Sequence, residues 1–188
     1  MDEYRTLAKV KPDPAVTITA LLAARLEQNP DGTLIEHASA PGGPWKPLTT
    51  REFDAAVVAV AKGLVARGIE PGRSVGIMSR TRYEWTLLDF AVWAIGAVPV
   101  PLYETSSAEQ VQWILSDADV ELLVVETDAL ADVVAQIRPT LPHLTDVLVI
   151  DDGAIGTLVN EGLAVADEEI DARRAATTGQ DLDRKSVV

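Results

Sequence analysis

The sequence is poor in several kinds of residue that carry chemistry. Its 188 residues include no cysteine and two histidines, and only 5% are aromatic. The absence of cysteine excludes disulfides, thiolate nucleophiles and cysteine-based zinc sites, and it fits a cytoplasmic protein. His37 and His143 lie far apart, and neither stands at ligand spacing from other metal-binding side chains. We therefore predict no metal site on this chain.

Basic residues are also scarce relative to acidic ones. Sixteen Lys and Arg face 29 Asp and Glu, which gives a formal net charge of -13. Such a surface repels phosphate backbones and anionic lipid headgroups. We expect no nucleic-acid partner, a cytoplasmic location, and any membrane contact of the parent protein to be peripheral.

One segment, 85–102, is apolar enough to test as a membrane span. A spanning helix needs about 20 predominantly apolar residues. Here Asp89 interrupts the segment, and Pro99 and Pro101 stand near its end. We therefore predict a buried helix followed by a buried strand. The first five residues, 1–5, lack the pattern of a signal peptide.

The apolar residues that are present alternate between strand and helix patterns. Such alternation is typical of βαβ units and a parallel sheet. We predict an α/β fold, a doubly wound and mostly parallel sheet with helices on both faces. The expected strands are 33–37, 45–48, 74–79, 98–102, 120–125 and 147–150, of which the first two could form a hairpin around a turn at 41–44. The expected helices begin near 17, 49, 81, 106 and 127, and weaker helical patterns cover 155–163 and 168–176.

Helix starts carry a recurrent capping signal. A Ser or Thr followed three residues later by Glu satisfies two early backbone N–H groups reciprocally. Three such boxes are present, Thr49 with Glu52, Thr81 with Glu84, and Ser106 with Glu109.

From these patterns we divide the chain into an extended arm at 1–16, an α/β subdomain at 17–150 and an acidic, partly helical tail at 151–188.

Several polar groups could carry chemistry, but a structural role explains each one better. Asp151 and Asp152 follow the last strand, where magnesium-binding carboxylates can stand, yet their usual partners are missing, which favours a solvated turn. The segment 105–107 could cradle a phosphate at a helix start, but it lacks glycines, and capping is favoured. Glu84 and Asp89 do not share a helix face.

Glu104 and Glu109 flank a helix start, where the helix dipole already explains them. The residues alone thus indicate an α/β module. We assign no catalytic, cofactor-binding or metal-binding residue.

Three segments, read in order, resemble the adenylate-forming superfamily of acyl- and aryl-CoA ligases. Residues 45–53, WKPLTTREF, resemble the family's W-x-x-L-T-[YW]-x-E-[LF]. Residues 68–77 with 83–85 resemble G-[IV]-x-P-G-D-R-V-A-I followed by the N-x-x-E-W of the long-chain branch, and residues 96–105 resemble that branch too. The likeness covers about 17–150, although Arg73 and Arg80 stand where the family often has Asp and Asn.

The same resemblance shows which motifs are missing. The family's phosphate loop, Y-T-S-G-T-T-G-x-P-K-G, normally follows an Asp-Leu pair. Asp181 and Leu182 are such a pair, but another sequence follows, and we interpret 177–179 as ordinary loop. We therefore expect a fragment truncated before the phosphate loop, without the family's magnesium-binding Glu, ribose-binding Asp or catalytic Lys.

The resemblance implies that the parent protein is a long-chain fatty-acid-CoA ligase. Such enzymes use ATP and Mg²⁺ to convert a fatty acid to acyl-AMP with release of pyrophosphate, and the thiol of coenzyme A then displaces AMP to give acyl-CoA. The fragment itself is expected to be inactive, to hold no cofactor, and to form oligomers or expose apolar surface. Two alternatives stay open: a fragment of another acyl- or aryl-CoA ligase or of an acyl-AMP ligase, or a non-catalytic α/β protein-binding module. A reading frame that continues into the phosphate loop would exclude the module.

Overall fold

The computed structural model describes residues 16–38 and 42–181. The predicted arm up to Ala15, the start of the predicted turn at 41–44 and the last residues from Leu182 lie outside the described residues. The main sheet has four parallel strands in the order β4-β3-β5-β6. Their bounds are β3 Ser74–Met78, β4 Val98–Leu102, β5 Val120–Val125 and β6 Asp146–Val149.

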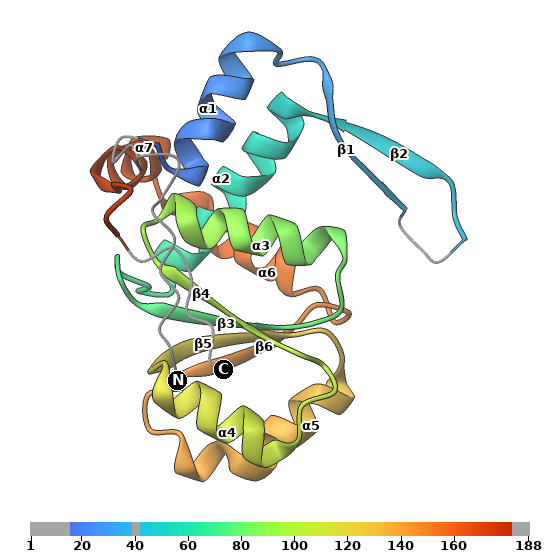
Figure 1. Cartoon of the computed structure of the whole chain (residues 1–188), viewed down its shortest axis with the longest axis vertical. Coiled ribbons are helices and arrows are strands. Elements are labelled where there is room, and N and C mark those ends of the chain that lie inside the picture. The colour runs from blue at the N-terminus through green and yellow to red at the C-terminus, as the bar shows by residue number, and fades with distance from the viewer. Residues whose placement is uncertain (1–15, 39–41, 182–188) are drawn as a thin grey trace, which may run out of the picture.

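Helices cover both faces of this sheet, as predicted (Figure 1). On one face lie α2 (Thr50–Ala66), α3 (Tyr83–Ala94) and α6 (Ala154–Glu161), and on the other lie α4 (Ala108–Asp117) and α5 (Asp128–Ile137). The central strands β3 and β5 are almost fully buried, which explains why their sequences are continuous apolar runs.

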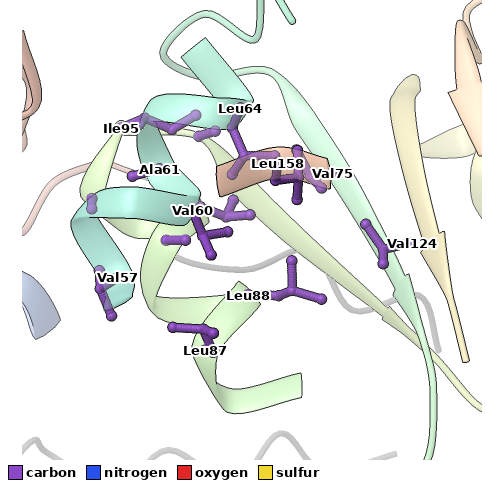
Figure 2. Packing of buried hydrophobic residues seen from close by; sticks show 14 of the residues in the cluster. Val57, Val60, Ala61, Leu64, Val75, Leu87, Leu88, Ile95, Val124 and Leu158 are labelled. Carbon is purple, nitrogen blue, oxygen red and sulfur yellow. The ribbon is translucent and has the colours of Figure 1, made fainter. Parts of the chain in front are cut away.

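Neighbouring residues of a strand point to opposite faces, so each strand supplies two separate cores. Ile77 and Val124 belong to the core under α2 and α3, whereas Met78 and Val125 belong to the core with α4 and α5. The first core is the larger. Figure 2 shows part of it, and its fully buried side chains include Val57, Val60, Leu64, Leu87, Leu88 and Leu158.

The helices after the last strand belong to this same core. Both predicted helices are confirmed as α6 and α7 (Asp167–Ala176), joined by a short 3₁₀ turn at Gly162–Ala164. Leu158 and Ile170 are fully buried among residues of α2 and α3. A Cβ added to Gly63 of α2 would lie only 2.1 Å from the Leu158 carbonyl oxygen. The two backbones therefore meet where only glycine fits.

The predicted hairpin is confirmed as β1 (Thr33–Ala38) and β2 (Trp45–Thr49), which pair antiparallel and extend away from the main sheet. An isolated two-stranded hairpin is marginally stable in water. Here its base is held because Thr50 donates its backbone N–H to Gly32 at 3.1 Å. Near its far end, His37 stacks on Tyr83 at the start of α3. Before the hairpin, α1 (Ile18–Gln28) packs beside α2.

Of the three predicted capping boxes, the first is confirmed and two are wrong. The box of Thr49 with Glu52 begins α2. At α3 the N-cap is Arg82 rather than Thr81. The Glu84 carboxylate accepts a hydrogen bond from the Arg82 guanidinium at 2.7 Å instead of completing a box with Thr81.

At α4 the box is shifted by one residue. Ser107 accepts a hydrogen bond from the backbone of Gln110 and Gln110 bonds back, so Ser106 and Glu109 do not form it. At α5 the N-cap is Thr127, close to the predicted start, and its side chain accepts a hydrogen bond from the backbone N–H of Leu130.

Across the part of the chain that the structure describes, no helix combines the length and apolarity needed to cross a membrane. The apolar segment 85–102 is divided between α3 and the short strand β4, as predicted.

Candidate functional site

The carboxyl ends of β3 and β5 form the topological switch point of the sheet. The chain leaves β3 through α3 towards β4, whereas it leaves β5 through α5 towards β6, on the opposite side and face. Loops that part in this way open a crevice, which is where α/β sheets of this type bind ligands. Here a cleft of about 760 Å³ lies between this edge and the hairpin. We call it the switch-point cleft; its walls include His37, Trp45, Arg80, Arg82, Tyr83, Glu84, Glu126 and Asp151.

Glu126, the first residue after β5, anchors the floor of the cleft. Its side chain is only 3% exposed, although it carries a carboxylate. Arg80, just beyond the end of β3, donates to this carboxylate from its backbone N–H at 2.9 Å, from Nε at 3.0 Å and from Nη2 at 2.5 Å. The Ser79 hydroxyl lies 3.3 Å from the same group. The buried charge is thus paired and hydrogen-bonded, as burial of a carboxylate requires.

Arg82 joins the loops that follow three strands. Its guanidinium bonds Glu84 at 2.7 Å and Asp151, just after β6, at 2.8 Å, and it lies 3.6 Å from Glu126. A planar guanidinium can serve several carboxylates at once because its donors point in fixed directions. Arg82 therefore ties the ends of β3, β5 and β6 together across the cleft.

This network shifts the protonation equilibria strongly towards the charged forms. The hydrogen bond from the Arg80 side chain lowers the pKa of Glu126 from 4.5 to about 2, against the opposing effect of burial. Burial raises the pKa of Glu84, but the bond to Arg82, a backbone hydrogen bond and the charge of Arg82 together outweigh that effect, and the net pKa is lowered. The bond to Glu84 raises the pKa of Arg82 above its ordinary value. A carboxylate with so low a pKa is a poor proton acceptor at neutral pH, so these groups do not form a general acid–base pair.

Aromatic side chains form the hairpin side of the cleft. The rings of His37 and Tyr83 stack with their centroids 4.6 Å apart, and burial raises the pKa of the Tyr83 phenol. Trp45, at the start of β2, leaves 70% of its surface exposed. The cleft thus combines an apolar wall with a floor of internally neutralised charges.

The polar residues that the sequence offered as candidates for a functional site mostly lie apart from one another in the structure. Asp151 is exposed in a turn as predicted, but it also bonds Arg82, which the sequence did not indicate. Asp89 is buried in α3 while Glu84 faces the cleft, so the two do not form a pair.

The remaining candidates have structural roles. Within 105–107, Ser107 caps α4, and 177–179 is loop as predicted, where Thr178 bonds Asp181 at 2.9 Å. Glu109 lies in the first turn of α4. The hydrogen bond to Glu126 is the main cause of the raised pKa of Arg80, and the charge of Glu104 adds a smaller effect. His143 lies 3.8 Å from Asp119, far in the fold from His37 beside Tyr83.

Sequence reasoning missed Glu126 and Arg82 as site residues. The available signal was their position: each follows a buried strand closely, and parallel strands end at one edge of a sheet. No local pattern indicated that Arg82 would pair with Glu126 and Asp151, which lie 44 and 69 positions further along the chain.

The switch-point cleft does not suit a magnesium ion. The carboxylates of Glu84, Glu126 and Asp151 already bond arginines, and the two guanidinium groups would repel a cation bound beside them. Elsewhere among residues 16–38 and 42–181, no group of three potential ligands is placed to hold a metal.

Comparison with known families gives one match over most of the chain. Residues 22–182 match the model of a family described as AMP-binding enzyme. The match spans the sheet, the helices on both of its faces and every residue that lines the switch-point cleft.

Among curated proteins, the long-chain-fatty-acid-CoA ligase FadD15 of Mycobacterium bovis is 44% identical over 142 residues, which are 74% of this chain and 24% of that protein. The chain thus spans about a quarter of the length of such relatives. Among solved structures, a long-chain-fatty-acid-CoA ligase of Archaeoglobus fulgidus matches with a TM-score of 0.71 at 19% identity, over 88% of this chain and 33% of that one. A fatty acyl CoA synthetase of Mycobacterium tuberculosis matches with a TM-score of 0.70 at 22% identity, over 90% and 32%. These two structures support the fold.

Proposed function

Because this chain belongs to the AMP-binding enzyme family, we propose that it forms one part of a long-chain fatty-acid-CoA ligase. The observation that carries the proposal is the 44% identity to a ligase of that specificity. The whole protein would join a fatty acid to coenzyme A through acyl-AMP, with ATP and Mg²⁺. Its location would be cytoplasmic, with membrane contact at most peripheral.

Within that enzyme we propose a scaffolding role for residues 16–181. Glu84, Glu126 and Asp151 of the switch-point cleft are paired with its two arginines, and Glu126 is held ionised by Arg80. In a two-step reaction of this kind the protein contributes positioning and charge neutralisation. We assign those tasks to residues outside this chain. The role that we assign to this chain is to form the rigid sheet that supports those residues.

The decisive experiment compares two proteins. The 188-residue chain and the whole protein are each assayed for acid-dependent exchange of pyrophosphate into ATP. We expect exchange from the whole protein and none above background from the chain, because the chain lacks the family's phosphate loop. Exchange by the purified chain would contradict the scaffolding role. No exchange by either protein with any acid would contradict the ligase proposal and favour a protein-binding module.

The acid specificity is tested on the whole protein. Formation of the coenzyme A ester is measured with acetate, benzoate, laurate and palmitate. Each buried CH₂ group contributes up to about 0.8 kcal/mol, so catalytic efficiency should rise steeply from acetate to the long acids. A preference for acetate or benzoate would refute the long-chain specificity while leaving the adenylate-forming activity intact.

A further inference from the structure

β4 carries two prolines in a five-residue strand at the edge of the sheet. Its sequence is Val98-Pro99-Val100-Pro101-Leu102, and it stands first in the order β4-β3-β5-β6. Among the described residues β3 is its only strand neighbour in that sheet. Proline removes a backbone donor and is found in sheets essentially only at edges and bulges.

The register determines which side of β4 each proline faces. β4 pairs in parallel with β3, with Pro99 opposite Val75 and Pro101 opposite Ile77. The Val98 N–H donates to the carbonyl of Arg73 at 2.8 Å. Backbone N–H groups of a strand alternate between its two sides, so those of Val98, Val100 and Leu102 face β3. The nitrogens of Pro99 and Pro101 therefore face the outer edge.

We propose that Pro99 and Pro101 close the outer edge of β4 to any added strand, whether from a second copy of this chain or from another segment. Along this edge the prolines present carbonyl acceptors without donors. Each ring also occupies the place where an N–H would meet an incoming carbonyl. The ladder to β3 loses nothing, because the residues that donate to it are not prolines.

The sequence of β4 makes such protection necessary. All five residues are apolar and uncharged, four are buried and Pro101 is half-buried. An apolar edge strand without charge or proline is a template for pairing between molecules. The two prolines therefore allow a buried, uncharged strand to stand at the edge.

The test restores the missing donors. In the chain of 188 residues, Pro99 and Pro101 are both replaced by valine, and sedimentation velocity is measured over a range of concentrations. We expect the double variant to begin to associate at lower concentrations than the original chain does. Pro142→Val is the matched control, since Pro142 is exposed in a turn outside the sheet. Association of the double variant equal to that of the original chain and the control would overturn the proposal.

Amide hydrogen exchange provides a second measurement, and its first part, on the original chain, does not depend on the variant's folding. In the original chain the amides of Val98, Val100 and Leu102 should exchange at least about a hundredfold more slowly than those of an unstructured peptide. In a folded monomeric variant, the new amides at positions 99 and 101 should exchange faster than that of Val100. Rapid exchange at Val100 in the original chain, or equal protection of the new amides, would show that the prolines do not face the open edge. If the double variant does not fold, the single Pro101→Val variant takes its place in both measurements.

Discussion

The contact between α2 and α6 predicts that a single added methyl group at Gly63 destabilises the protein. A Cβ at this position would lie 2.1 Å from the Leu158 carbonyl oxygen, 2.5 Å from its carbon and 2.7 Å from its Cα. All three are backbone atoms, so no rotamer change can relieve the overlap. The α6 backbone would have to move away, and with it Glu161, which bonds Arg67 of the α2 C-cap at 2.6 Å.

Two opposing effects set the magnitude for Gly63→Ala. Alanine is favoured over glycine inside a helix by about 1 kcal/mol. Overpacking a filled core costs about 1–3 kcal/mol, and a rigid backbone obstacle places this site at the upper end. We expect a net loss of about 2 kcal/mol, which for a chain of this size lowers Tm by about 4–8 °C.

The matched control is Gly156→Ala. Gly156 is exposed within α6, and a Cβ there would meet nothing within 4 Å. The same substitution should stabilise the protein by about 0.5–1 kcal/mol, since only the helix preference changes. Urea unfolding followed by circular dichroism measures both variants. If Gly63→Ala were as stable as the original chain, with an unchanged dependence on urea, the close packing of α6 on α2 would be refuted.

Two further predictions concern charge and association. Glu126→Gln should lower the free energy of unfolding by about 1–3 kcal/mol at pH 7. The pKa of Glu126 is lowered in the folded state, so this stabilisation is complete above pH 4.5 and is lost as the pH falls through about 2. Urea unfolding at several pH values should show that the difference in unfolding free energy between the two proteins shrinks over that range. A constant difference would contradict the pairing of Glu126 with Arg80. The exposed side chains of Trp45, Tyr103 and Leu163 lead us to expect dimers or larger species of the chain alone. Light scattering that shows a monomer at high concentration, together with no binding of a dye for apolar surface, would contradict that expectation.

Much of the fold was predictable because its strands and helices carry their own signals. The run 120–125 is apolar throughout, as a strand covered on both faces must be, and it is β5. Thr49 and Glu52 satisfy each other within four residues, so their capping box needs no distant partner.

The errors occurred where distant residues decide the outcome. Thr81 and Glu84 match the same capping pattern, but Arg82 bonds Glu84, and its position is also fixed by Asp151 and Glu126. Near α4, Ser106 with Glu109 and Ser107 with Gln110 fit the pattern equally well, and the position at which the helix begins selects the second pair.

The switch-point cleft was less predictable than the fold for the same reason. Its residues come from the hairpin and from the loops after three strands, and only the topology brings them together. The sequence indicates a carboxylate at 151 and arginines at 80 and 82, but it does not indicate which charge pairs with which. Pairing within the cleft is a property of the assembled sheet.

The position of α6 also has a consequence for synthesis of the protein on the ribosome. Arg67 and Glu161, which join the end of α2 to α6, are 94 residues apart in the chain. At about 5–20 residues per second, α2 is made roughly 5–20 s before the helix that covers it. During that interval the apolar face that later contacts Leu158 has no native cover. The nascent chain is therefore most exposed to chaperones and to misfolding before α6 emerges, and a pause in translation between these two helices would lengthen that exposure.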